Sequence, residues 1–209
     1  MSRYITNLEL SSQRAALTAK ELAAVVADTG GVLIPAHAFT PHKSVYGNAG
    51  RRCSEIFGER WAEIPAVEIG LSSDTTLADR IDELHPLTLI TNSDAHSLEK
   101  IAREYNVIRM EAPNYRELML ALRRQGGRGV IANYGTDPRL GRYNRSYCLK
   151  CDKSCPGEGV ILACPTCGCH LRKDFVVGVS DRVSHIADRA EPLHPGHRPP
   201  YHYQVPLSF

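Results

Sequence analysis

The stretch LTLITNSDAH, residues 87–96, runs from an apolar segment directly into an aspartate and a histidine. LTLIT is too short for a helix of its own and is typical of a buried strand. Asp94 and His96 are two residues apart, so in an extended segment their side chains point to the same side. The stretch therefore predicts a strand whose carboxyl end presents a carboxylate and an imidazole together.

Similar apolar runs and helical patterns alternate around this stretch. The other short runs that we predict as strands are VLIPA (32–36), AVEIG (66–70) and GVIAN (129–133). The helical patterns cover residues 11–28, 75–84, 98–105 and 115–124. This alternation predicts βα units around a parallel sheet. After Tyr134 the composition changes to Gly, Arg, Tyr and Cys, so we expect an α/β domain over residues 1–134 and a second region over residues 135–209. Its Pro-rich tail, residues 194–206, is expected to wrap the surface.

Ligands bind at the carboxyl ends of the strands in sheets of this kind. His37 follows VLIPA directly and can reach the same face as Asp94 and His96. Carboxylate plus imidazole suits Zn²⁺, Mn²⁺ or Fe²⁺. The alternative is that D-x-H occurs by chance and that Asp94 caps a helix, because SDAHSLEK resembles a helix start. Glu68 could face the same pocket, although an acid near a strand end is more often solvated or hydrogen-bonded.

Two cysteine pairs form a sharper pattern. Twelve residues separate Cys148-x2-Cys151 from Cys164-x2-Cys167. This is the spacing of a zinc ribbon, with four sulfurs around a structural Zn²⁺. The alternative, a metal-free loop, is disfavoured because so short and polar a segment lacks the apolar mass to fold unaided.

The remaining cysteines carry no pattern of their own. Seven cysteines are an odd number for a disulfide framework, and six of them lie between Cys148 and Cys169, which favours metal binding in a reducing compartment. Cys155 and Cys169 are interpreted as spectators, although either could substitute for a neighbouring ligand. Cys53 stands alone and is expected to be buried in the core.

The composition is that of a globular protein. With 209 residues and 43% hydrophobic content, the chain can form one sizeable core plus a small appendage. No apolar run approaches the roughly 20 residues of a membrane span. The N-terminal sequence has no apolar segment ahead of a cleavage site, so we expect the protein in the cytoplasm, with no membrane partner.

Positive charge gathers in one part of the chain. Between Arg123 and Lys173 there are ten Lys or Arg and three Asp or Glu. Within this part, Arg139, Arg142 and Arg145 recur every three residues among tyrosines. Guanidinium groups suit phosphates and aromatic rings suit bases, so the loop is a candidate nucleic-acid contact. The alternative is a solvated basic loop; the neighbouring ribbon favours DNA or RNA.

Longer blocks of sequence carry a resemblance. They are PAHAFTPHKSVYG, VEIGLSSDT, ITNSDAHSLEKIAREYN, ANYGTDPRLGRYNRSYCLKC, GVSDRVSHIADR and HRPPYHYQVPL. These blocks resemble the endonuclease Q family, enzymes of the PHP (polymerase and histidinol phosphatase) superfamily with a zinc ribbon. The resemblance implies a metal-dependent hydrolase that nicks DNA on the 5′ side of deaminated bases such as uracil and hypoxanthine. It implies a PHP-type (βα) barrel, here partial, followed by a C-terminal zinc-ribbon region.

The resemblance also implies roles for single residues. His37 matches the single histidine after a central strand, and Asp94 and His96 match the final D-x-H, so these three are expected to bind divalent ions, Zn²⁺, Mn²⁺ or Mg²⁺. Asp94 is the expected catalytic residue. The four paired cysteines match the family's ribbon and its structural zinc.

One departure limits this expectation. PHP proteins open with an H-x-H pair, and this sequence contains none. The chain resembles a central-to-C-terminal piece, so we expect weak or no activity from it alone unless a partner chain, or a residue such as His42, completes the site. The competing prediction is a noncatalytic zinc-ribbon module that binds nucleic acid. A PHP phosphatase acting on small phosphoesters is disfavoured, because that activity needs neither ribbon nor basic loop.

Overall fold

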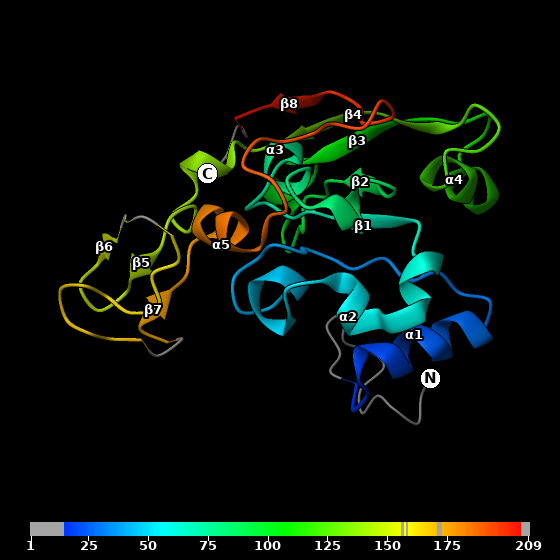
Figure 1. Ribbon diagram of the computed structural model, residues 1–209. Coiled ribbons are helices and arrows are strands. Elements are labelled where there is room, and N and C mark those ends of the chain that lie inside the picture. The colour runs from blue at the N-terminus through cyan, green and yellow to red at the C-terminus, as the bar shows by residue number, and fades with distance from the viewer. Residues whose placement is uncertain (1–14, 156, 158, 171–172, 206–209) are drawn as a thin grey trace.

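The computed structural model describes residues 15–155, 157, 159–170 and 173–205 (Figure 1). The strands are β1 (Ala66–Glu68), β2 (Thr88–Ile90), β3 (Tyr105–Arg109), β4 (Gly129–Gly135), β5 (Tyr147–Cys148), β6 (Lys153–Ser154), β7 (Phe175–Val176) and β8 (Tyr201–Tyr203). The α-helices are α1 (Ala19–Asp28), α2 (Cys53–Phe57), α3 (Thr75–Ala78), α4 (Tyr115–Leu122) and α5 (Val179–Ile186). Single 3-10 or π turns are η2 (Val45–Ala49), η3 (Gly58–Glu63), η4 (Asp82–Leu84), η5 (Leu98–Lys100) and η6 (Pro138–Leu140). In these ranges no helix is long and apolar enough to cross a membrane.

The strands of the described residues form three small sheets. β1 and β2 pair in parallel, as predicted for AVEIG and LTLIT. β4 lies between β3, which is antiparallel to it, and β8, which is parallel. β5 pairs with β6 and β7 in the ribbon region, at one side of the molecule (Figure 1). The mixed α/β class is therefore confirmed. The prediction of a uniformly parallel sheet was wrong, because β3 and β4 are antiparallel, and the described strands do not close into a barrel.

Two predicted elements were wrong. Residues 98–105 form only the turn η5 and then enter β3, in which exposed and half-buried residues alternate. Its sequence, YNVIR, has apolar residues on both faces, so the period of two was hidden. VLIPA forms no regular strand. It still runs beside β1, because Pro35 accepts a hydrogen bond from the Glu68 N–H at 3.0 Å, but proline has no N–H to continue a ladder.

The main core lies between the β1–β2 sheet and the helices around it. Val67, Ile69 and Leu89 are fully buried against residues of α2, η4 and α5. α1 begins at Ala19 because Thr18 and Glu21 form a reciprocal capping box. The predicted helix start, residues 11–14, lies outside the described residues. Cys53 is fully buried in this core, as predicted.

The C-terminal tail is fixed to the core by a buried ion pair. The side chain of Arg198 is 2% exposed, and its Nε and Nη2 donate to the fully buried carboxylate of Asp79 at 3.0 and 2.8 Å. His194 Nδ1 lies 2.7 Å from the same carboxylate. Arg198 also donates to the carbonyls of Leu84 and Leu87, at 3.2 and 2.9 Å. These contacts satisfy the buried charges and position β8 beside β4.

The ribbon region is joined to α5 by a second buried carboxylate. Asp181 accepts hydrogen bonds from the Ser146 N–H and hydroxyl at 2.7 and 2.8 Å. Gly178, just before α5, lies so close that a Cβ there would be 2.2 Å from the carbonyl carbon of Arg145. Only glycine fits this approach, so the chain entering the ribbon and the chain leaving it are held together.

Candidate metal and nucleic-acid sites

Glu68, at the end of β1, joins three of the predicted strand ends. Its carboxylate accepts hydrogen bonds from the backbone N–H groups of His37, Gly70 (2.7 Å) and Asn92 (3.4 Å). Gly70 follows β1, and Asn92 follows β2 and lies two residues before Asp94. The segments that carry the predicted ligands therefore meet at one edge of the β1–β2 sheet, as expected for the carboxyl ends of parallel strands.

The environment of Glu68 is unusual for a carboxylate. Glu68 is only 7% exposed. This burial raises the pKa of its carboxyl group, and the three backbone hydrogen bonds oppose that effect. One signal in the sequence pointed to this role, an acid inside the apolar run VEIG, but hydrogen bonding to distant backbone groups is not visible in a sequence.

Two of the predicted ligands occupy strained backbone positions. His37 has φ of 37° and Asp94 has φ of 45°, in the left-handed region that non-glycine residues rarely adopt. Such residues are common at functional sites, where the surrounding structure maintains the strain. His37 Nδ1 is buried and has no hydrogen-bond partner among the described residues. Its lone pair or its proton is thus available to a ligand.

Asp94 and His96 lie together in the loop after β2. His96 Nδ1 is 3.9 Å from Asp94 Oδ1 and 2.9 Å from the Asp94 carbonyl oxygen. Both side chains are exposed. Arg103 anchors the loop, because its Nε donates to the Ser93 carbonyl at 2.6 Å. Asp94 caps no helix; η5 begins after Ser97. The D-x-H pair therefore projects from a fixed loop toward solvent.

The structure brings His37 close to this loop through Glu68 but does not assemble a full donor set there. Among the described residues, one group of three or more His, Cys, Asp or Glu has its ligand atoms close enough to hold a metal. This group is the four-cysteine cluster. A site shared by His37, Asp94 and His96 therefore stays a prediction.

Replacing Gly70 by alanine is expected to destabilise this corner. Gly70 has φ of 75°, and a Cβ there would lie 3.0 Å from His37 Cα. We expect a loss of about 2 kcal/mol in the free energy of unfolding, measured by urea denaturation. Gly127→Ala is the matched control. Its φ is 77° but nothing lies within 4 Å, so only the backbone strain of about 1 kcal/mol should remain. Equal losses in the two variants would show that Gly70 is not needed for the approach of His37.

A second buried acid lies behind the site. Glu104 precedes β3, is 2% exposed, and accepts a hydrogen bond from the Thr136 N–H at 2.9 Å. Its other oxygen and the hydroxyl of Tyr201 are both buried with no partner among the described residues. Burial, with a smaller contribution from the charge of Glu68, raises the pKa of Glu104 to about 7. This residue is therefore largely protonated below neutral pH.

Glu104 should make the stability of the fold depend on pH. Its folded pKa of about 7 lies above the unfolded value of 4.5, so its stabilising contribution is complete below pH 4.5 and is lost as the pH rises through 7. Glu104→Gln is expected to be about 3 kcal/mol more stable than wild type at pH 8 and equally stable near pH 4. Urea denaturation across this range measures the effect, with the exposed Glu191→Gln as control. Parallel pH profiles for wild type and Glu104→Gln would contradict it.

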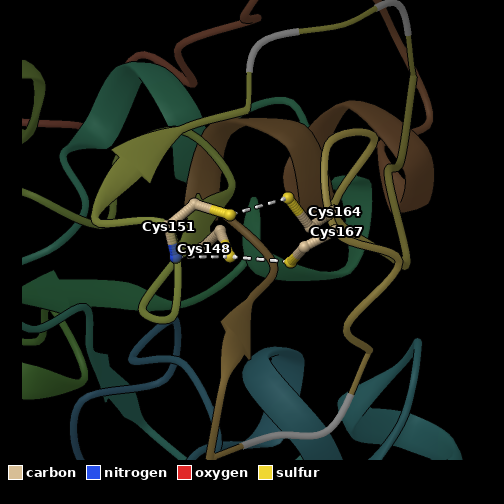
Figure 2. Close-up of side chains that lie close together, drawn as sticks. All are labelled: Cys148, Cys151, Cys164 and Cys167. Carbon is tan, nitrogen blue, oxygen red and sulfur yellow. Dashed lines mark hydrogen bonds between the residues drawn. The ribbon is translucent and has the colours of Figure 1, made fainter.

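The four paired cysteines form a compact cluster (Figure 2). Their sulfurs all lie within 4.8 Å of one another, with 3.7 Å between Cys148 and Cys167 and 3.9 Å between Cys151 and Cys164. Four sulfurs bound to zinc at about 2.3 Å form a tetrahedron with edges of about 3.8 Å. The Cys151 N–H also donates to Cys148 Sγ at 3.2 Å, as is usual around a thiolate. The cluster fits the predicted structural zinc.

The two leftover cysteines are closer than the sequence suggested. Cys169 Sγ lies 3.3 Å from Cys148 Sγ, and Cys155 Sγ lies 3.9 Å from Cys164 Sγ. Six sulfurs therefore occupy one small volume. Cys155 and Cys169 were interpreted as spectators from their spacing along the chain alone. The turn over residues 164–169 brings Cys169 back to the cluster.

The three arginines of the basic loop all have carboxylate partners. Arg139 pairs with Asp137 at 2.6 Å, Arg142 pairs with Asp152, and Arg145 pairs with Asp181 at 2.7 Å. Arg142 also stacks on the ring of Tyr147, 4.3 Å from its centroid. The side chains of all three arginines remain at least 44% exposed, so they can still reach a phosphate. Their contact with nucleic acid stays a prediction.

No protein-family model matches this sequence. The chain is 44% identical to the uncharacterized protein YqxK of Bacillus subtilis (strain 168), over all of this chain and 52% of that protein. It is 35% identical to the uncharacterized protein MJ0043 of Methanocaldococcus jannaschii, over 81% of this chain and 21% of that protein. The chain therefore spans about half of the first relative and about a fifth of the second.

Two solved structures share the fold over nearly the whole chain. One is the lesion-specific endonuclease PfuEndoQ from Pyrococcus furiosus, with a TM-score of 0.83 and 32% identity over 98% of this chain and 50% of that one. The other is endonuclease Q in complex with a 27-mer duplex substrate with an abasic lesion at the active site. It has a TM-score of 0.85 and 32% identity over 99% of this chain and 51% of that one. The predicted resemblance to endonuclease Q is confirmed.

Proposed function

We propose that this chain, similar to endonuclease Q over its whole length, carries the D-x-H portion of the active site of a metal-dependent DNA endonuclease. The enzyme would hydrolyse the phosphodiester on the 5′ side of deaminated bases such as uracil and hypoxanthine and so begin their repair. One observation supports this most. Glu68 joins the backbone of His37, Gly70 and Asn92 at one sheet edge, where the ligand-bearing segments must meet.

The residues at this edge would have separate tasks. His37 would bind through its neutral imidazole, and Asp94 and His96 would bind from the loop after β2. Glu68 would position the backbone of His37 and the loop. Divalent ions bound there, Mg²⁺, Mn²⁺ or Zn²⁺, would supply an acidic water and stabilise charge on the leaving oxygen.

The basic loop is the proposed contact to the DNA backbone. Each of its arginines is paired with a carboxylate and yet partly exposed. A phosphate could therefore exchange with the carboxylate partner, and the affinity should fall as salt rises. The ring of Tyr147 holds the guanidinium of Arg142 by stacking, and so reduces the entropy that binding would cost.

The remaining ligands are proposed to come from outside these 209 residues. The sequence has no H-x-H pair, and His37, Asp94 and His96 supply only three donors. A segment carrying the opening strands of a PHP-type barrel, on the same polypeptide or on a partner chain, would complete the site, and we expect these residues alone to be weakly active or inactive.

A noncatalytic module is the second candidate. The four-cysteine cluster favours this candidate. Among the described residues, three or more potential metal ligands come together at these cysteines and not at the D-x-H pair. In that case the ribbon and the basic loop would bind nucleic acid, and no combination with a partner would restore cleavage.

A nicking assay separates the two candidates. The chain, alone and mixed with the part of YqxK that lies outside the matched region, is incubated with Mn²⁺ and a duplex that contains one uracil or hypoxanthine. We expect Asp94→Ala to lower the nicking rate about 100-fold, because a metal ligand and its charge are lost. Asp28→Ala, at the end of α1, should leave the rate unchanged. DNA binding without nicking in every mixture would favour the module, and nicking by Asp94→Ala at the wild-type rate would exclude Asp94 as a catalytic residue.

A further inference from the structure

The zinc site of the ribbon contains more sulfurs than one ion can bind. A tetrahedral zinc needs four, and the sulfurs of Cys155 and Cys169 lie against the four paired ones. Cys148 Sγ is nearer to the leftover Cys169 Sγ, at 3.3 Å, than to its expected fellow ligand Cys167, at 3.7 Å. A single tetrahedral zinc cannot use both Cys167 and Cys169 together with the other three sulfurs. One thiol must therefore stay unbound in direct contact with a bound thiolate.

The backbone holds Cys169 in this position. The Cys164 N–H donates to the Cys169 carbonyl at 2.8 Å, and the Gly168 N–H donates to the Cys164 carbonyl at 2.8 Å. Gly168 adopts φ of 70°, which closes the turn. Besides its contact with Cys148, the sulfur of Cys169 makes a weak contact, 3.6 Å from the Asp174 carbonyl oxygen. The side chain can thus move the roughly 1.3 Å that separates contact from a disulfide bond length.

The two close pairs differ in access. Cys155 and Cys164 are both buried, with 2% exposure each. In the other pair, Cys148 is fully buried, but Cys169 is half-buried and its neighbour Cys167 is exposed. A small oxidant can therefore reach Cys169 more easily than Cys155 or Cys164.

We propose that Cys148 and Cys169 are an oxidation site, at which a peroxide converts the two thiols into a disulfide and releases the zinc. The inference depends on zinc at the four-cysteine cluster and not on the nuclease function. The Cys169 thiol, the more accessible of the two, takes one oxygen from hydrogen peroxide, giving a sulfenic acid and water. The Cys148 thiolate then attacks the sulfenic sulfur and displaces its oxygen as hydroxide, so one peroxide and two cysteine sulfurs give one disulfide, one water and one hydroxide.

The disulfide removes one ligand from the zinc. Three thiolates remain where four held the ion, so its affinity falls and the ribbon, which depends on the metal, opens. A thiol reductant and fresh Zn²⁺ reverse the change. The basic loop precedes β5 directly, so the same event would loosen the proposed DNA contact.

The test uses the zinc-loaded chain, hydrogen peroxide and a chromogenic zinc chelator. We expect Cys169→Ser to hold one zinc and to release it at least fivefold more slowly than wild type. Cys155→Ser, which removes the buried leftover thiol, should release zinc at the wild-type rate. Peptide mass spectrometry should find the Cys148–Cys169 disulfide in wild type, and reductant with Zn²⁺ should restore the metal.

Several outcomes would overturn the proposal. Zinc release from Cys169→Ser at the wild-type rate would do so, as would a disulfide that joins other cysteines. A wild-type chain that binds no zinc would also overturn it. A Cys169→Ser chain that cannot hold zinc would show that Cys169 is a ligand. No readout involves DNA cleavage. Failure here therefore leaves the proposed nuclease function standing, and failure of the nicking assay leaves this proposal standing.

Discussion

Replacing Cys164 by serine is expected to remove the zinc and unfold the ribbon region, residues 147–176. The hydrophobic cluster of this region consists mostly of the cysteines themselves with Phe175. Its strands are two residues long. So little apolar area cannot offset the entropy of ordering the chain, whereas a structural zinc contributes about 10 kcal/mol or more. This is the largest single effect that we expect from any substitution in the chain.

Zinc content and limited proteolysis measure this effect together. Cys164→Ser should contain no zinc after dialysis, and trypsin should cut it rapidly at Lys150 and Lys153. Cys53→Ser is the matched control: Cys53 is buried in the main core, a hydrophobic cluster separate from that of the ribbon, so this variant should lose some stability but keep its zinc. A Cys164→Ser chain with bound zinc and an unchanged melting curve would contradict the account.

Replacing Arg198 by methionine should cost about 4 kcal/mol in the free energy of unfolding. The substitution leaves the fully buried carboxylate of Asp79 without its main partner, and an uncompensated buried charge is expensive. Two buried carbonyls, of Leu84 and Leu87, lose their donors as well. The tail should detach from the core first, because Arg198 supplies most of its hydrogen bonds to Asp79, Leu84 and Leu87.

A surface ion pair and a double variant serve as controls. Arg189→Met removes a partner of Asp82 at a distance of 2.6 Å, but this pair is a third to a half exposed, so the loss should stay within about 1 kcal/mol. Asp79→Asn combined with Arg198→Met removes the buried charge altogether and should recover part of the stability. Equal effects of Arg198→Met and Arg189→Met would show that burial does not determine the strength of the Asp79 contact.

The features that could be predicted from the sequence depend on short intervals along the chain. The parallel strands β1 and β2 follow from apolar runs with clear ends, and the cysteine cluster follows from two C-x2-C pairs. The prediction for Asp94 and His96 assumed an extended segment, but Asp94 has φ of 45° in the loop after β2, so the period of two does not account for their placement. In the other two cases the residue types and their spacing within a short stretch decide the structure.

The features that were missed join residues far apart. Glu68 binds backbone groups 24 and 31 residues away, and Arg198 binds a carboxylate 119 residues away. A helix was predicted over residues 98–105 and β3, which begins at Tyr105, was not predicted, because pairing with β4 determines the conformation of β3 and local propensity does not. Buried polar contacts of this kind satisfy groups that have no signal of their own in the sequence.

The most direct test of the central claim is a crystal of this chain soaked in Mn²⁺ and measured near the manganese absorption edge. The claim is that His37, Asp94 and His96 bind divalent ions at the edge of the β1–β2 sheet. It predicts an anomalous peak there, about 2.2 Å from Asp94 oxygen and from at least one histidine nitrogen, which Asp94→Ala abolishes. Peaks confined to the cysteine cluster or to scattered surface carboxylates would contradict the claim.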